Sequence, residues 1–127
     1  MAIKRTKWDV VFSNLIRYRD KWTCQRCGRV YPEGSQGLHC SHFFGRGTWA
    51  TRLEEANAMA LCFGCHQRVG SNPIDHIELW EFKFSMDERT RIKDLYYRTT
   101  FLKKRDIANE ETYAKLKSRL EEVKIYD

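Results

Sequence analysis

The chain has 127 residues, of which 42% are hydrophobic and 13% aromatic, enough for one compact core and too few for two full-sized domains. Lysine and arginine outnumber aspartate and glutamate by 23 to 17, which favours a polyanionic partner, foremost a nucleic acid. No apolar run approaches the roughly 18 residues of a membrane-spanning helix, and the basic N-terminus lacks the apolar segment of a secretory signal. We therefore expect a cytoplasmic protein with a single domain over residues 1–127.

Hydrophobic periodicity and turn residues predict the elements of the first half. The segment TKWDVVFSNLIRYRD places apolar residues at helical spacing, which predicts a helix over 6–20. CQRCG predicts a tight turn closed by Gly28, LHCSHF predicts a strand, and the stretch after it predicts a loop. From about Asn57, AMALCFGCHQRV is expected to form a helix that ends near Gly70 and Pro73.

The last third of the chain predicts further helices. IDHIELWEFKF is so rich in apolar residues that we expect much of it to be buried, with Trp80, Phe82 and Phe84 in the core rather than on a base-stacking surface. Ser85 and Glu88 have the spacing of a capping box at the start of the next helix. The final charged helix carries one apolar stripe, formed by Tyr113, Leu116, Leu120 and Val123. The predicted fold class is α+β, a small metal-bearing core wrapped by N- and C-terminal helices.

Four of the five cysteines form two close pairs, Cys24 with Cys27 and Cys62 with Cys65. Two CxxC pairs can direct four thiolates at one point and complete a tetrahedral zinc site. The alternative, a redox-active pair, requires an alternation of strands and helices that the sequence does not predict. Because four sulfurs leave no open coordination position, we expect the zinc to be structural. The fifth cysteine, Cys40, is expected to be a buried small apolar residue.

The insert between the cysteine pairs has 34 residues, more than the roughly 15–20 of a simple zinc ribbon. It contains five polar residues that can carry chemistry, and a further histidine directly follows the second pair: His39, His42, Arg46, Arg52, Asn57 and His66. Because a strand alternates its faces, His39 and His42 are expected to point to opposite sides unless the strand bends at Ser41.

The stretches RDKWTCQRCG, HCSHFFGR, NAMALCFGCH and GSN, within residues 14–72, resemble the zinc-bearing HNH endonucleases. More narrowly they resemble phage NinG-type recombination nucleases and, more distantly, phage endonuclease VII. The resemblance implies a ββα-metal core and metal-dependent hydrolysis of DNA to 5′-phosphate and 3′-hydroxyl ends. It also implies a phage-encoded protein that could act on branched or recombination DNA. It does not extend to the helical extension of about residues 74–127.

The resemblance implies a role for each matching residue. His42 corresponds to the general base that deprotonates water, and Asn57 to the asparagine that ties the loop and holds this base. His66 corresponds to a ligand of the catalytic ion, which we expect to be Mg²⁺ or Mn²⁺, with Ni²⁺ as an alternative. An imidazole with a pKa near neutrality suits a general base, and a divalent ion can neutralise the charge on the leaving oxygen.

Ser41 departs from the family pattern, in which many members have a metal-binding aspartate or histidine directly before the base. A serine hydroxyl is a poorer ligand, so Ser41, His39 and Asn72 are all tentative ligands of the catalytic ion. His39 could equally have a structural role. Arg46 and Arg52 are expected to bind DNA phosphates, or else to be solvated surface charges.

The sequence is compatible with two other functions. The protein could be a zinc-stabilised DNA-binding module with weak or no catalysis, as the substitution at Ser41 suggests. It could also be an interaction subunit of a phage DNA-processing machine, with the C-terminal helices as its functional surface. The apolar segment after Pro73 is compatible with a homodimer.

Overall fold

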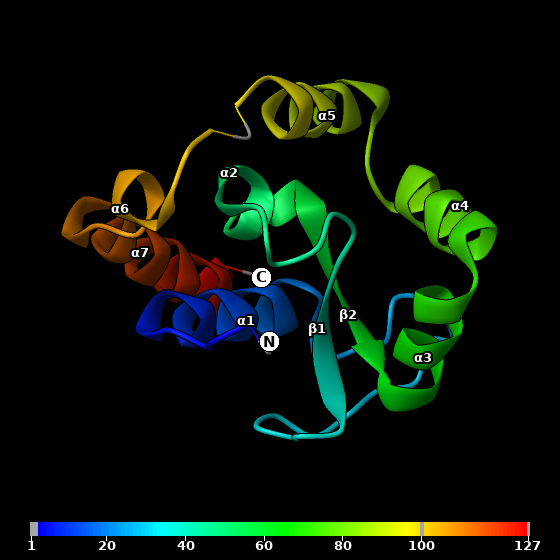
Figure 1. Ribbon diagram of the computed structural model, residues 1–127. Coiled ribbons are helices and arrows are strands. Elements are labelled where there is room, and N and C mark those ends of the chain that lie inside the picture. Colours follow the sequence, from blue (N-terminus) through cyan, green and yellow to red (C-terminus); the bar gives the residue numbers. More distant parts are fainter. Residues whose placement is uncertain (1–2, 100, 127) are drawn as a thin grey trace.

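The computed structural model describes residues 3–99 and 101–126, which form a mixed α+β fold (Figure 1). Strands β1 (Leu38–His42) and β2 (Ala58–Cys62) make a two-stranded antiparallel sheet, and helix α3 (Phe63–Ser71) follows β2 without a loop. In the register of the two strands, His42 pairs with Ala58 and His39 pairs with Leu61. The α+β class and the predicted first strand are confirmed.

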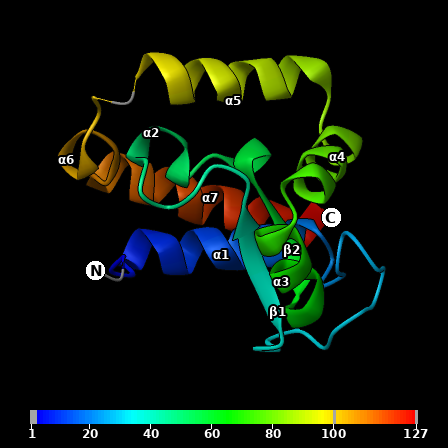
Figure 2. The ribbon, with the colours of Figure 1, turned by 45° about the vertical axis from the view of Figure 1, so that its right-hand side comes forward.

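Helix α1 (Lys7–Arg19) lies against one side of this unit, and α7 (Glu110–Tyr126) runs alongside it (Figures 1 and 2). A capping box between Thr6 and Asp9 starts α1, because each residue bonds the backbone N–H of the other. The buried face of α1 and the apolar stripe of α7 share one core cluster, which contains Phe12, Leu15, Ile16, Leu116 and Val123. Both predicted helices are confirmed.

The helix expected from Asn57 begins later than predicted. Residues Ala58–Cys62 form strand β2 instead, and the helix starts at Phe63. Alanine, methionine and leucine favour helix in isolation, but pairing with β1 buries the first four residues of this segment and overrides that preference. The stretch expected to be only a loop contains the short helix α2 (Trp49–Arg52) and the 3₁₀ turn η1 (Glu55–Asn57).

Helix α4 (Pro73–Lys83) is less buried than predicted. Trp80 and Phe84 are in the core as expected, and the Trp80 indole N–H donates to the Ala56 carbonyl at 2.8 Å. In contrast, Ile74 and Phe82 are 68% and 88% exposed, because α4 packs through only one side. The assignment of Phe82 to the core is therefore wrong.

Two further helices connect α4 to α7. Helix α5 (Met86–Arg98) begins with the predicted capping box of Ser85 and Glu88, and α6 (Lys104–Ile107) precedes α7. No helix within residues 3–99 and 101–126 is both long enough and apolar enough to cross a membrane.

Candidate functional site

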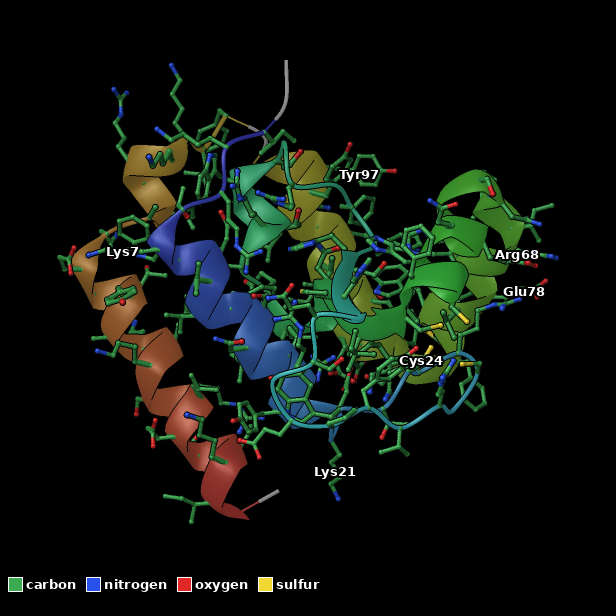
Figure 3. All side chains as sticks on the ribbon, turned by 90° about the horizontal axis from the view of Figure 1, so that it is seen from below. Lys7, Lys21, Cys24, Arg68, Glu78 and Tyr97 are labelled. Atoms are coloured by element: carbon green, nitrogen blue, oxygen red, sulfur yellow. The ribbon has the colours of Figure 1, made fainter. Side chains whose placement is uncertain are left out.

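The four paired cysteines converge at one end of the sheet, where their sulfur atoms lie together near the Cys24 label in Figure 3. Cys24 and Cys27 lie in a tight turn that Gly28 closes: its N–H donates to the Cys24 carbonyl at 2.9 Å, and its φ of +78° is a conformation that favours glycine. Cys62 ends β2 and Cys65 lies in the first turn of α3.

The ligand atoms of this cluster all lie within 4.8 Å of one another, and the Cys27 and Cys62 sulfurs are 3.9 Å apart. In a tetrahedral zinc site with Zn–S bonds of about 2.3 Å, the sulfurs are about 3.8 Å apart. The four cysteines are thus positioned to hold a metal ion, and a structural zinc fits them.

A residue that the sequence did not single out supports the cysteine cluster. The Arg26 guanidinium donates to the Cys65 sulfur at 3.5 Å. A zinc ion with four thiolates carries a net negative charge, so a cation beside one sulfur stabilises the centre.

Strand β1 is regular through Ser41, so His39 and His42 point to opposite faces as expected. His39 faces α3, where its Nδ1 lies 3.1 Å from Nδ1 of His66. Burial and the neighbouring His39 lower the pKa of His66. Two imidazole nitrogens that share one ion at about 2.1 Å lie roughly 3.0–3.4 Å apart. The distance therefore suits either a hydrogen bond between the rings or a shared divalent ion.

The other tentative ligands have different surroundings. Ser41 is buried, at 2% exposed. The Asn72 side-chain oxygen accepts the backbone N–H of Asp75 at 3.2 Å and so caps α4. Cys40 packs into the apolar cluster around α1, and burial raises the pKa of its thiol to about 12.

His42 lies on the opposite face, with its ring 5.6 Å from that of Phe12. Its Nε2 is 2.9 Å from the Arg52 carbonyl oxygen. Since a carbonyl can only accept, Nε2 carries the proton and Nδ1 keeps its lone pair. Burial lowers the pKa of His42 to about 4, so the ring is neutral at neutral pH. The Nδ1 lone pair is therefore free to accept a proton at neutral pH, but His42 is a weaker base than the near-neutral imidazole expected from the sequence.

Asn57 is fully buried and ties together the two ends of the loop between the strands. Its side-chain oxygen accepts the Phe44 N–H at 2.9 Å, and its amide group donates to the Phe44 and Thr51 carbonyls, both at 3.0 Å. These bonds fix the backbone directly before Arg52, whose carbonyl holds His42.

Arg52 is inside the protein rather than on the surface where we expected it to bind phosphate. Its side chain is 4% exposed and forms two hydrogen bonds to Asp9, at 2.6 and 3.0 Å. Burial opposes the ionisation of Asp9, but hydrogen bonds from Arg52 and Thr6 outweigh it and lower the pKa of Asp9 to about 2. The Arg52 guanidinium therefore has no free face for DNA, and it is not a solvated charge either.

Arg46 differs from Arg52, because its side chain is 34% exposed and 3.8 Å from the Asp9 carboxylate. Its Nε and Nη2 atoms have no hydrogen-bond partner in the described part of the chain. Both atoms are buried, and Nη2 is the one turned toward Asp9, so Nη1 is the donor of Arg46 left to reach an anion.

A concavity of about 520 Å³ lies between α1 and β1 and reaches His39, His42 and Arg46. Arg5 and Arg17 also line it, and the sequence alone did not identify them as site residues. This concavity, here called the α1–β1 groove, is therefore lined both by the His42 imidazole and by arginine side chains.

Comparisons with protein-family models, with curated proteins and with solved structures give no match for this chain.

Proposed function

We propose that this protein is a metal-dependent DNA endonuclease that hydrolyses phosphodiester bonds through a ββα-metal site of the HNH kind. The observation that carries the proposal is that one β1–β2–α3 unit holds both His42 and the His39–His66 pair, and that His42 and His39 line the same groove. This arrangement agrees with the roles that the family resemblance implies for His42, Asn57 and His66.

In this mechanism His42 is the general base. Nδ1 accepts a proton from the attacking water, and the Nε2–H bond to the Arg52 carbonyl orients the ring and stabilises the imidazolium that forms. Asn57 is a positioning residue, since it fixes the loop that carries this carbonyl. Arg46 lines the same groove as His42, where its positive charge and its Nη1 donors attract the scissile phosphate.

His39 and His66 are the proposed ligands of the catalytic divalent ion, which would neutralise charge on the leaving 3′ oxygen. His39 takes the ligand role that Ser41 cannot perform well, and no bend in β1 is needed for this. Two imidazole ligands favour Mn²⁺ or Ni²⁺ over Mg²⁺, because imidazole is softer than oxygen ligands.

A plasmid-nicking assay with Mg²⁺, Mn²⁺ or Ni²⁺ tests the proposal. His42→Ala should lose roughly 10²–10⁴-fold in rate at any concentration of divalent ion while still binding DNA and structural zinc. His66→Ala should be partly restored by excess Mn²⁺. Glu78→Gln, a change at an exposed position of α4, is the control and should nick normally.

The rival function is a DNA-binding module without catalysis. It predicts that the wild-type protein binds DNA and nicks it with none of the three ions. Nicking by His42→Ala at the wild-type rate would also reject the proposed base.

A further inference from the structure

The α1–β1 groove has an excess of positive charge close to His42. Arg5, Arg17 and Arg46 line it, and Asp9 is the one carboxylate among its lining residues. Because the two hydrogen bonds from Arg52 already neutralise Asp9, three guanidinium groups remain without a full counter-charge. No ion pair joins Arg5 or Arg17 to a carboxylate within residues 3–99 and 101–126.

Arg17 is held rigidly at the free edge of β1. This strand pairs with β2 on one side, and on its other side the Leu38 carbonyl accepts the Arg17 Nε–H at 2.8 Å. Asn14 accepts a longer bond from Nη1 at 3.4 Å. The guanidinium is therefore fixed beside Leu38, the residue before His39, and its Nη2 has no hydrogen-bond partner among the described residues.

Arg5 approaches the same groove from the segment that precedes α1. Its Nη2 donates to the Ser13 hydroxyl at 3.0 Å, and Nε and Nη1 make no further side-chain bonds in the described chain. Burial and the nearby Arg5 lower the pKa of Arg17, so the two guanidinium groups repel each other. An anion between them removes this repulsion.

We propose that Arg5 and Arg17 bind backbone phosphates of the substrate strand next to the scissile phosphate, so that this strand crosses the free edge of β1. The placement of these contacts next to the scissile phosphate rests on the proposed function, whereas the binding of DNA in the groove does not. The fixed guanidinium of Arg17 suits a phosphate because a planar fork can donate two parallel hydrogen bonds. Such contacts are independent of base sequence.

The test measures binding of fluorescent single-stranded and duplex DNA to the zinc-loaded full-length protein without added Mg²⁺ or Mn²⁺. Arg5→Ala and Arg17→Ala should each weaken binding roughly tenfold at low salt and reduce the slope of log affinity against log salt by about 1. Arg98→Ala is the matched control, since Arg98 is 80% exposed on α5 outside the groove, and it should bind as the wild type does.

Arg17 also bonds the Leu38 carbonyl, so Arg17→Lys is included in case Arg17→Ala fails to fold. Lysine keeps the charge but not the planar fork, so the salt slope should be retained while affinity falls. Wild-type affinity and slope in both Arg5→Ala and Arg17→Lys would overturn the inference, as would an equal loss in Arg98→Ala. Arginine-dependent binding without any nicking would reject the proposed enzyme and leave the groove assignment standing.

Discussion

The buried ion pair of Arg52 and Asp9 joins the start of α1 to α2. The same guanidinium donates to the Arg46 and Lys4 carbonyls and stacks on Trp49 at 4.0 Å, so one side chain fixes three segments. A sequence-based prediction of phosphate binding fails here because an arginine near a glycine-rich loop gives no sign of a carboxylate 43 positions away. Its partner can be recognised only once α1 is packed against the loop.

Removal of this guanidinium should destabilise the protein strongly. Arg52→Ala leaves the Asp9 carboxylate buried without its cation, and breaking such a pair costs about 3–5 kcal/mol. Equilibrium unfolding in urea measures the loss. The control is Arg91→Ala, which breaks an exposed pair with Glu54 and should change the free energy of unfolding by no more than about 1 kcal/mol. A similar small effect of both variants would contradict the structural role of Arg52.

The burial of His42 makes stability depend on pH. Its pKa falls from 6.5 to about 4 on folding, so between these values the unfolded chain binds more protons than the folded one. Stability is then greatest above pH 6.5 and decreases by up to roughly 3 kcal/mol as the pH falls through this window. The free energy of unfolding is measured for the zinc-loaded wild type and for His42→Gln between pH 4 and pH 6.5. Because loss of zinc in acid destabilises both proteins, the difference between them reports the contribution of His42. The variant should lose less stability, and parallel curves would reject the assignment.

At the scale of elements, the cysteine spacing was sufficient to predict a four-sulfur cluster, because two residues between cysteines bring both sulfurs to one side of a turn. Strand β2 could not be predicted in the same way, since Ala-Met-Ala-Leu prefers helix until β1 pairs with it. The capping box at Ser85 was predicted because it is local, while the exposure of Ile74 and Phe82 depends on which side of α4 packs.

The β1–β2–α3 unit should depend on zinc. Cys24 is 1% exposed and links the turn after α1 to Cys62 and Cys65 of β2 and α3. Cys24→Ser should therefore bind less than one equivalent of zinc and lose cooperative unfolding, because metal binding is coupled to folding. Metal analysis and circular dichroism test this. Cys40→Ala, at a partly buried cysteine outside the cluster, should retain one zinc. A soluble and cooperatively folded Cys24→Ser protein would contradict the structural role.

At the scale of the whole molecule, the C-terminal helices complete the fold around the candidate site. Phe43, directly after His42, stacks on Trp80 of α4 with ring centroids 3.9 Å apart. Phe44 stacks on Tyr96 of α5 at 4.0 Å. These stacks fix the loop that follows β1, and α7 packs along α1 (Figure 2). The helical extension therefore supports the site from two directions, although the sequence motifs stop before it.

If the protein were an interaction subunit whose C-terminal helices act on their own, the rest of the chain would fold without them. The packing of α7 on α1 predicts the opposite. Removal of residues 100–127 should expose the buried face of α1 and leave an aggregating or molten protein, because α7 supplies Leu116 and Val123 to that core. The milder change Leu116→Ala should lower the free energy of unfolding by about 2–4 kcal/mol and keep nicking activity in the protein that remains folded. Ser118→Ala, at an exposed position of the same helix, should alter stability by no more than about 0.5 kcal/mol. A truncated protein that unfolds cooperatively and nicks DNA as fast as the full chain would show that α7 is a separate attachment rather than part of the core.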